Sequence, residues 1–333
     1  MCLQHVRQLG RAMADDMSLA PVYTVTLNWN LQVDTIACVE SVLAAGVPRA
    51  QVIIVDNGST DGSVTALAAR FGPELQLVCN AQNLGFGGGM NEGIRHALEH
   101  GAGSVLLLNN DTVVDPGMAT ALLEAYDSLG RPGILGPAIY YYDVPGRIWR
   151  LGDIVYRWLP MPLPARLNGK SLSALVPFQV DYVTGCGMLV CREVFERVGL
   201  FDRRYFMYFE DADFCGRARD AGFAVWCVPR ARMWHKVSAT ARRDGPVNRY
   251  HRALNQVRFY HEHAHGRSAV LREGYIAAKL LKTTMGDVWH RDWDLVGPLW
   301  KGTLDGYREQ ARRMGGPCAN LPVDPAPSPG EKD

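Results

Sequence analysis

Strand and helix patterns alternate regularly between residues 22 and 110, and this alternation constrains the fold more than any other feature of the sequence. Short apolar runs of the kind found in buried strands are separated by helical patterns. The runs span 22–27, 51–55, 75–79 and 104–108, and the helical patterns span 34–45, 64–70 and 91–100. This order predicts an α/β fold with right-handed βαβ units and a mainly parallel central sheet with flanking helices.

Clusters of polar residues follow three of the predicted strands. They lie at Asn28–Asn30, Asp56–Asp61 and Asn109–Asp111. In open parallel sheets, ligands gather at the carboxyl ends of the strands. We therefore expect a nucleotide-type site in the first half of the chain.

Charge is distributed unevenly along the 333 residues, although the formal net charge is only +1. Residues 1–229 carry 17 basic and 23 acidic side chains, whereas residues 230–315 carry 17 basic and 8 acidic ones. The acidic part suits a divalent cation, and the basic part suits phosphates, nucleic acid or an anionic membrane. A merely solvated surface explains these counts equally well.

The termini and cysteines indicate a cellular location. No apolar run reaches the roughly 18 residues of a transmembrane helix, and the N-terminus lacks the apolar stretch of a signal peptide. The eight cysteines form no CxxC pair, so we expect reduced thiols and a cytoplasmic protein, with peripheral contact at the inner face of the cell membrane left open.

We also expect a flexible leader at 1–20, a flap over the sheet at 137–180, helices over 247–314 and a disordered tail at 315–333.

Two acidic turns follow buried strands. Asp56, in the run Asp-Asn-Gly-Ser-Thr-Asp-Gly-Ser, can accept a hydrogen bond from a nucleobase N–H, and the glycines let the backbone approach a ligand. Asp111, after Leu-Leu-Leu-Asn-Asn, can hold Mg²⁺ or Mn²⁺ together with substrate phosphates. Tight turns and helix caps have the same composition, so neither segment is decisive alone.

Three carboxylates, Glu210, Asp211 and Asp213, lie within four positions and are flanked by aromatic residues. Such crowding raises a carboxyl pKa, which suits a general base, whereas the alternative is an acidic start of a helix. His235 is a candidate metal ligand, although a single histidine is more often structural. Arg242 can pair with a pyrophosphate.

The glycine run Gly85–Gly89 does not have the G-x-G-x-x-G spacing of a dinucleotide site, because Met90 occupies the last position. The run also follows the third predicted strand rather than the first. We therefore reject dinucleotide binding and predict a glycine-rich loop ahead of the helix at 91–100.

Together these segments resemble the family 2 glycosyltransferases with the GT-A fold, particularly the bacterial rhamnosyltransferase-like members. The resemblance runs from about Val22 to about Gly315, and its landmarks occur in the family's order. They are VTLNWN (25–30), VDNGSTDGS (55–63), NLGFGGGMNEGI (83–94), LLLNNDT (106–112), GCGMLVCREVFERVGLFDRRYFMYFEDADFCGRA (185–218) and WHKVSAT (234–240). The resemblance implies a catalytic domain at 21–246, with a nucleotide-sugar half at 21–115 and an acceptor half at 116–246.

The resemblance also implies a role for each candidate residue. Asp211 matches the catalytic base, and Glu210 and Asp213 would orient it or the acceptor. Asp111 and His235 match the metal ligands for Mg²⁺ or Mn²⁺. Asn109 stands where the family's DxD motif has its first acid, which removes one anionic ligand. The implied substrate-binding residues are Asn28, Asn30, Asp56 (at the nucleobase), Asn57, Asn83, Asn91, Asn109, Asp213 and Arg242.

The implied activity is inverting transfer of a sugar from a nucleoside-diphosphate sugar, either dTDP-rhamnose or a UDP-hexose. The acceptor would be a hydroxyl of a glycan or lipid-linked molecule in cell-surface polysaccharide synthesis. One alternative is a non-catalytic sugar-nucleotide or glycan-binding module, which the joint presence of Asp56, Asp111, Asp211 and His235 argues against. A nucleotidyltransferase would carry a basic, glycine-rich loop at residues 28–32, which contain neither Lys nor Arg.

The basic C-terminal helices have two interpretations. Their tryptophans and lysines, including Trp289, Trp293 and Lys282, suit a surface that lies on a membrane near a lipid-linked acceptor. The other interpretation, which we favour slightly, is a helical hairpin that packs on the catalytic domain or on a second subunit, as in a homo-oligomer. Nucleic acid is not an expected partner, because the basic residues belong to helices with apolar faces.

Overall fold

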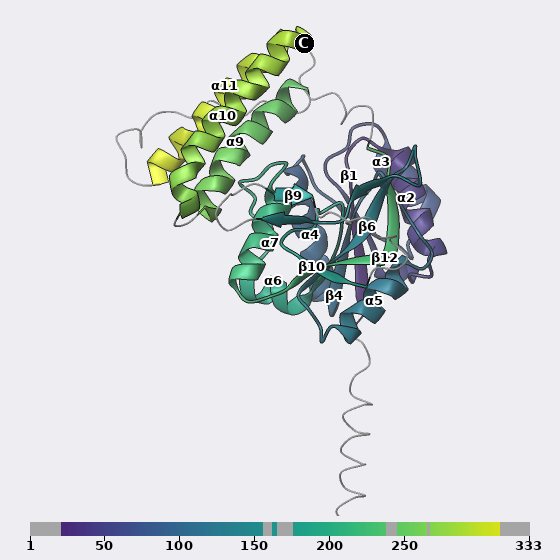
Figure 1. Ribbon diagram of the computed structural model, residues 1–333. Coiled ribbons are helices and arrows are strands. Elements are labelled where there is room, and N and C mark those ends of the chain that lie inside the picture. Colours follow the sequence, from purple (N-terminus) through teal and green to yellow (C-terminus); the bar gives the residue numbers. More distant parts are fainter. Residues whose placement is uncertain (1–20, 156–161, 165–175, 238–244, 265–266, 314–333) are drawn as a thin grey trace, which may run out of the picture.

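The computed structural model describes residues 21–155, 162–164, 176–237, 245–264 and 267–313 (Figure 1). The predicted leader, the predicted tail and Arg242 lie outside these described residues. So do residues 156–161 and 165–175 of the predicted flap.

The alternation predicted for the first half of the chain is confirmed. The elements are β1 (Val22–Asn28), α2 (Gln32–Ala44), η1 (Arg49–Gln51), β2 (Val52–Asp56), α3 (Ser63–Phe71), β3 (Gln76–Cys79), α4 (Gly85–Glu99) and β4 (Ser104–Asn109). Strand β1 pairs in parallel with both β2 and β4, and β2 pairs in parallel with β3. The ends of these strands therefore meet at one edge of the sheet.

The second half of the sheet is mixed. Its elements are β5 (Thr112–Val114), α5 (Met118–Ser128), β6 (Ile134–Tyr141), β7 (Ile148–Arg150), β10 (Phe178–Val180), β11 (Gly187–Cys191), α6 (Arg192–Val198), α7 (Glu210–Asp220) and β12 (Val225–His235). Strand β11 is antiparallel to β4 and β6, whereas β12 is parallel to β6. Among the described strands the order is β10-β12-β6-β11-β4-β1-β2-β3. Because β11 is reversed, its first residues lie at the edge where β1, β2 and β4 end.

The prediction of a flap at 137–180 is wrong for its first part. Residues 137–141 belong to β6, which is buried in the sheet between β11 and β12. The content of aromatic residues and proline over 137–180 favours an excursion. However, Pro137 lies where the register of β12 shifts after Val228, and a strand irregularity accommodates a residue that has no N–H. Beyond β7, β8 (Asp153–Val155) and β9 (Pro162–Pro164) form a separate antiparallel pair.

Helices cover both faces of the sheet (Figure 1). Side chains of α4, α6 and α7 join Val25 and Leu107 in one core cluster, while side chains of α2, α3 and α5 join Ile54 and Leu108 in another. Successive strand residues point to opposite faces, so the central strands are buried on both sides. This two-sided burial explains why they are continuous apolar runs in the sequence.

The run Gly85–Gly89 forms the first turn of α4 and not the loop that we predicted. Gly85 has a φ of +76°, and a Cβ there would lie 2.3 Å from the carbonyl oxygen of Phe206. A Cβ on Gly93 would lie 2.4 Å from Cγ1 of Val25. Close packing of this helix on its neighbours therefore outweighs the low helix propensity of glycine.

Helices α9 (Pro246–His263), α10 (Arg267–His290) and α11 (Trp293–Arg313) form a bundle next to α7 and the sheet (Figure 1). Helix α11 packs mainly on α9. Tyr205 packs in one apolar cluster with Val257 and Tyr260 of α9, so the bundle contacts the segment ahead of α7. Within the described part of the chain, we find no helix with the length and apolar character needed to cross a membrane.

Candidate active site

Asp56 ends β2 directly beside Asn28, which ends β1. Its Oδ2 accepts a hydrogen bond from Nδ2 of Asn28 at 2.7 Å, and its Oδ1 accepts one from the N–H of Ser59 at 2.9 Å. Asn30 lies beside them, and its Oδ1 accepts a hydrogen bond from the N–H of Thr60 at 2.8 Å. The hydrogen bond from Ser59 closes a tight turn of the kind that Asp, Asn, Gly and Ser favour. Each carboxylate oxygen still has a second lone pair that a ligand can use.

Asn57, Asn83 and Asn91 hold segments of the chain together. Asn57 donates from Nδ2 to Oδ1 of Asn83 at 2.9 Å, and its own Oδ1 accepts from the N–H of Leu84 at 3.1 Å. Asn91 exchanges two hydrogen bonds with the backbone of Phe201, at 2.8 and 3.0 Å. These contacts fix the loop between β3 and α4 and the segment after α6. Contact of these three asparagines with a donor stays a prediction.

Strand pairing brings Asp111 and His235 together. Strand β12 runs antiparallel to β5, and its last residue, His235, is the register partner of Thr112. The N–H of Lys236 then donates to the carbonyl oxygen of Asp111 at 2.8 Å. In this arrangement Nε2 of His235 lies 3.0 Å from Oδ1 of Asp111. Residues 124 positions apart in the chain thus present their side chains to the same point.

The turn between β4 and β5 contains a buried polar atom without a partner. Asn110 donates from Nδ2 to the hydroxyl of Thr35 at 2.9 Å, which ties the turn to α2. In contrast, Oδ1 of Asn109 is buried and has no hydrogen-bond partner among the described residues. Burying such an atom is costly unless something pairs with it. Asn109 therefore keeps a free acceptor beside Asp111.

Asp211 lies in the first turn of α7 and is held by the segment that precedes β11. Its Oδ2 accepts hydrogen bonds from the hydroxyl of Tyr182 and from the N–H of Gly185, both at 2.9 Å. Asp211 is 9% exposed. Burial, and then the nearby carboxylate of Asp211, raise the pKa of the Tyr182 hydroxyl well above its ordinary value. Tyr182 therefore remains a proton donor to Asp211.

Asp211 and Asp111 lie at the same edge of the sheet. Gly185 bonds to Asp211, and the next residue, Cys186, accepts a hydrogen bond at its carbonyl oxygen from the N–H of Asn109 at 3.0 Å. After burial, the carboxylates of Asp111 and Asp211 both contribute to raising the pKa of the Cys186 thiol. Gly185 and Cys186 directly precede the reversed strand β11, which starts where β4 ends.

Tyr182 and Asp153 are neighbours of Asp211 that the sequence analysis missed. Asp153 donates from its N–H to the carbonyl oxygen of Tyr182 at 2.8 Å. Burial raises the pKa of the Asp153 carboxyl, Arg150 at 3.1 Å lowers it, and Asp211 raises it again. No motif marks either residue, because their position depends on pairing between distant segments.

Glu210 is buried beside Asp211, and its Oε2 has no hydrogen-bond partner among the described residues. Burial, followed by repulsion from Asp211, raises the pKa of the Glu210 carboxyl well above its ordinary value. We expected a raised pKa in this acidic cluster, and Glu210 has it.

Replacing Glu210 with Gln is expected to stabilise the fold more at pH 8 than at pH 5. A carboxyl whose pKa is raised on folding binds its proton more tightly in the folded state, so stability falls as the pH rises above the ordinary value. The Gln variant does not lose stability in this way. The difference in melting temperature, variant minus unaltered protein, should therefore be roughly 2–4 °C larger at pH 8 than at pH 5. Glu124→Gln, on the exposed side of α5, is the control. A difference in melting temperature that does not change with pH would contradict the burial of an unpaired Glu210.

The contacts of Asp213 lie on the side of the C-terminal helices. Its Oδ2 accepts from Nε of Arg217 at 2.8 Å, and its Oδ1 lies 2.8 Å from Nε2 of His263 on α9. Asp213 therefore links α7 to the helical bundle. Its proposed role in orienting the acceptor stays a prediction.

Comparisons with known proteins agree with this geometry. Residues 25–199, which include the ends of β1, β2 and β4 and the whole of β11, match the family described as glycosyl transferase family 2. The chain belongs to this family. The sequence resemblance to it is confirmed, including its rhamnosyltransferase-like character.

The family 2 chain is similar to two rhamnosyltransferases. It is 31% identical over 221 residues to N-acetylglucosaminyl-diphospho-decaprenol L-rhamnosyltransferase of Mycobacterium tuberculosis, covering 58% of this chain and 68% of the relative. It is 24% identical over 247 residues to dTDP-rhamnosyl transferase RfbF of Shigella flexneri, covering 70% and 78%. The chain is therefore a rhamnosyltransferase-like glycosyltransferase.

Solved structures show that the fold is GT-A. The mannosyltransferase PcManGT from Pyrobaculum calidifontis, solved with GDP-Man and Mn²⁺, superposes with a TM-score of 0.52 at 16% identity. The match covers 91% of this glycosyltransferase and 78% of that chain. The overall fold is thus shared with a glycosyltransferase of very different sequence.

The segment ahead of α7 in this glycosyltransferase has an unusual backbone. Tyr208 and Phe209 have φ values of +67° and +73°, which residues with side chains seldom adopt. Asn255 of α9 donates from Nδ2 to the carbonyl oxygens of Met207 and Tyr208, at 2.8 and 3.2 Å. The ring of His251 stacks on Phe206, with centroids 5.0 Å apart. Helix α9 thus supports the strained turn that presents Glu210 and Asp211.

A second group of acidic and histidine side chains lies outside this edge. Asp213, Glu262 and His263 offer ligand atoms within 4.8 Å of one another. Their charges are already paired, since Arg217 binds Asp213 and Arg204 lies 2.8 Å from Glu262. We interpret this group as a structural link between α7 and α9.

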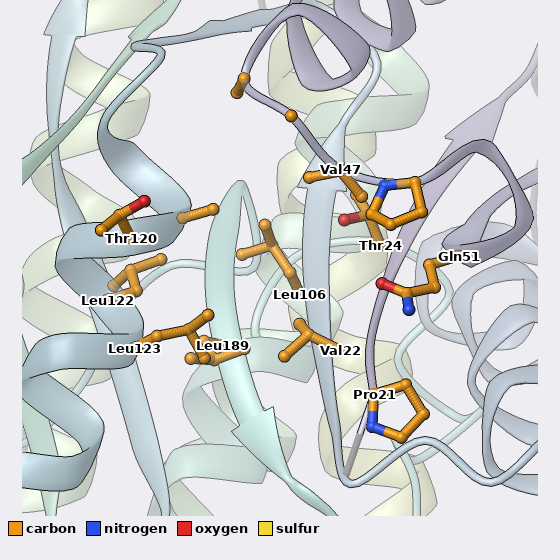
Figure 2. A pocket seen from close by; sticks show the side chains of 14 residues that line it. Pro21, Val22, Thr24, Val47, Gln51, Leu106, Thr120, Leu122, Leu123 and Leu189 are labelled. Atoms are coloured by element: carbon orange, nitrogen blue, oxygen red, sulfur yellow. The ribbon is translucent and has the colours of Figure 1, made fainter. Parts of the chain in front are cut away.

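An apolar pocket of about 330 Å³ lies beside Val22 and Thr24, in the first half of β1 (Figure 2). Val22, Leu106, Leu122 and Leu189 line it, and none of the predicted site residues does. Its first lining residue, Pro21, directly follows the part of the chain that is not described. The pocket lacks the charged groups that would bind a diphosphate.

Proposed function

We propose that this glycosyltransferase is an inverting, metal-dependent enzyme that transfers rhamnose from dTDP-rhamnose to a hydroxyl of a glycan or lipid-linked acceptor. The observation that carries the proposal is that Asp111 contacts His235 at the sheet edge that also holds Asp56 and to which Gly185 links Asp211. The names of the two rhamnosyltransferase relatives support the donor sugar, and one of them names a lipid-linked acceptor. A UDP-hexose is the alternative donor.

Asp211 is the proposed general base. The acceptor hydroxyl gives its proton to the Asp211 carboxylate while its oxygen forms a bond to the anomeric carbon. The bond between that carbon and the diphosphate oxygen breaks on the opposite face, so the configuration inverts and the nucleoside diphosphate leaves. Tyr182 and Gly185 hold the carboxylate in place by their hydrogen bonds. A positioned base of this kind contributes about 10²–10⁴-fold to the rate.

Asp111 and His235 are the proposed ligands of a Mg²⁺ or Mn²⁺ ion. Oδ1 of Asp111 and Nε2 of His235 are 3.0 Å apart, so both side chains could bind the same ion. The Oδ1 of Asn109, two positions before Asp111 in the chain, is buried without a partner among the described residues and is a further candidate oxygen ligand. When bound, the ion supplies positive charge that stabilises the leaving diphosphate. Arg242 is proposed to assist at the diphosphate.

The first half of the sheet edge is the proposed donor site. Asp56 would accept the N3–H of a pyrimidine base at its remaining lone pairs, with Asn28 and Asn30 beside it. Asn57, Asn83 and Asn91 would shape the pocket through the segments that they hold.

We propose domain bounds of 21–246 for the catalytic part and 247–314 for the helical part, in a cytoplasmic protein.

A screen of donor hydrolysis tests this proposal. The full chain is incubated with dTDP-rhamnose, UDP-glucose, UDP-galactose and GDP-mannose, each with Mn²⁺, Mg²⁺ or EDTA, and release of the nucleoside diphosphate is measured. We expect release from dTDP-rhamnose that needs a divalent ion and stops with EDTA. Tight binding of a sugar nucleotide with no release, even after addition of candidate acceptors, would favour a non-catalytic binding module. Release of the nucleoside diphosphate from a UDP-hexose, and not from dTDP-rhamnose, would identify the UDP-hexose as the donor and leave the proposed mechanism unchanged.

A further inference from the structure

The segment at 204–209 leads directly into α7, and its last two residues are strained. Tyr208 and Phe209 have φ values of +67° and +73°, in the left-handed region. Residues with side chains stay in that region only where surrounding contacts hold them there. Glu210 and Asp211 follow as the first two residues of α7. A change of φ at either strained residue would therefore redirect the turn that presents Asp211.

Asn255 of α9 binds the backbone of this segment. Its side chain is fully buried, and its Nδ2 donates to the carbonyl oxygens of Met207 and Tyr208, at 2.8 and 3.2 Å. These two carbonyl groups belong to the planar peptide groups that precede Tyr208 and Phe209. One buried amide thus restrains rotation at both strained residues.

Arg258, which lies one turn further along α9, fixes the orientation of the Asn255 amide. Arg258 is buried, and its Nη1 donates to Oδ1 of Asn255 and to the carbonyl oxygen of Arg204. Its Nε donates to Oε1 of Glu309 on α11 at 3.1 Å. A reversed amide would turn its N–H groups toward the guanidinium, which has no acceptor. The amide therefore keeps its donating side toward the strained turn.

The same segment is also held from the side of α4. The N–H of Phe86, near the start of α4, donates to the carbonyl oxygen of Phe206 at 2.8 Å. The carbonyl group of Phe206 is thus fixed by α4, and those of Met207 and Tyr208 are fixed by α9. Three successive carbonyl groups ahead of α7 have defined partners, and Asn255 supplies the partner for the two next to the strained residues.

We propose that Asn255 is a positioning residue for the general base, because its grip on the carbonyl groups of Met207 and Tyr208 sets the direction in which α7 presents Asp211. This inference rests on the proposed function of Asp211. It makes α9, which lies outside the proposed catalytic bounds of 21–246, a working part of the active site. A displacement of about 1 Å at a reacting group can lower a rate by about 10²-fold.

The variant Asn255→Asp tests this role in the full chain. Asp has nearly the same size and still accepts the hydrogen bond from Arg258, but its second oxygen cannot donate to the two carbonyl groups. We expect kcat for release of dTDP from dTDP-rhamnose to fall by about 10–100-fold, whereas the donor dissociation constant from calorimetry should change by less than about twofold. Asn255→Ala introduces no charge and should give the same result, which covers the case that the Asp variant does not fold.

Hydrogen exchange followed by mass spectrometry gives a measurement that does not depend on activity. Peptides over 204–215 should exchange roughly tenfold faster in both Asn255 variants, while peptides over β4 should be unchanged. Tyr250→Phe is the matched control. Tyr250 is also buried on α9, but its hydroxyl donates to Asp305 of α11 at 3.1 Å and not to the turn. This control should retain kcat and slow exchange over 204–215.

The outcomes separate this inference from the proposed function. Retained kcat in both Asn255 variants, or unchanged exchange over 204–215, would overturn the positioning role. An equal loss of kcat in Tyr250→Phe, or a matching loss of donor affinity in the Asn255 variants, would overturn it too, because general loss of stability would then explain the effect. Full release by Asp211→Asn would instead overturn the proposed base, whatever the Asn255 variants do.

Discussion

Replacing Asp211 with Asn is expected to lower kcat by about 10²–10⁴-fold while the affinity for the sugar nucleotide changes little. Asn is nearly the same size and can still accept hydrogen bonds from Tyr182 and Gly185, so the first turn of α7 should keep its position. What the variant loses is the ability to take a proton from the acceptor hydroxyl. Steady-state transfer kinetics and calorimetric donor binding measure the two quantities separately.

Asp220→Asn is the matched control for this experiment. Asp220 is the exposed last residue of the same helix, so its replacement removes one charge from α7 without touching the sheet edge. It should transfer sugar at the rate of the unaltered enzyme. Full activity of the Asp211 variant would remove this residue from the role of base, and Glu210 would become the next candidate.

Replacing Asp111 with Asn is expected to weaken Mn²⁺ binding in the presence of nucleoside diphosphate by about 10²–10³-fold, with a similar fall in kcat/KM. The variant replaces the carboxylate of Asp111 with a neutral amide, so the proposed site loses one negative charge next to His235. His235→Ala should act in the same direction. Electron paramagnetic resonance of free Mn²⁺ gives the affinity directly.

Asp115→Asn serves as the control for metal binding. Asp115 follows β5 and lies 2.9 Å from Arg232 near the surface, four residues beyond Asp111. Its loss should leave Mn²⁺ affinity unchanged. If Asp111→Asn binds Mn²⁺ as well as the unaltered protein does, the cation is held elsewhere. The group of Asp213, Glu262 and His263 would then need to be examined.

Local sequence patterns predicted the first half of the fold well because they reflect two-sided burial of short strands. Once the strands are predicted, their carboxyl ends are predicted as well. The positions of Asp56 and Asp111 at one edge of the sheet were therefore predictable. The meeting of Asp111 with His235 was implied only by the family resemblance, since it depends on the antiparallel register of β12 on β5. No local pattern contains that register.

Other features depend on contacts that a sequence does not display. The low helix propensity of glycine does not predict the helical start of α4, because Gly85 and Gly93 allow close packing on Phe206 and Val25 that the sequence does not display. The support of Asp211 by Tyr182 was missed for the same reason. Asp213 belongs to the same acidic run as Asp211, but its place on α7 aims it at His263. Neighbouring acids on a helix point in different directions, so composition alone does not assign them one task.

Anomalous diffraction from crystals grown with Mn²⁺ and dTDP tests the central claim most directly. The account predicts a manganese peak within bonding distance of Asp111 and His235, with the diphosphate bound to the ion and the thymine ring against Asp56. Asp211 should face the same cavity from the side of β11. A manganese peak at Asp213, Glu262 and His263, or a nucleotide bound away from Asp56, would contradict it.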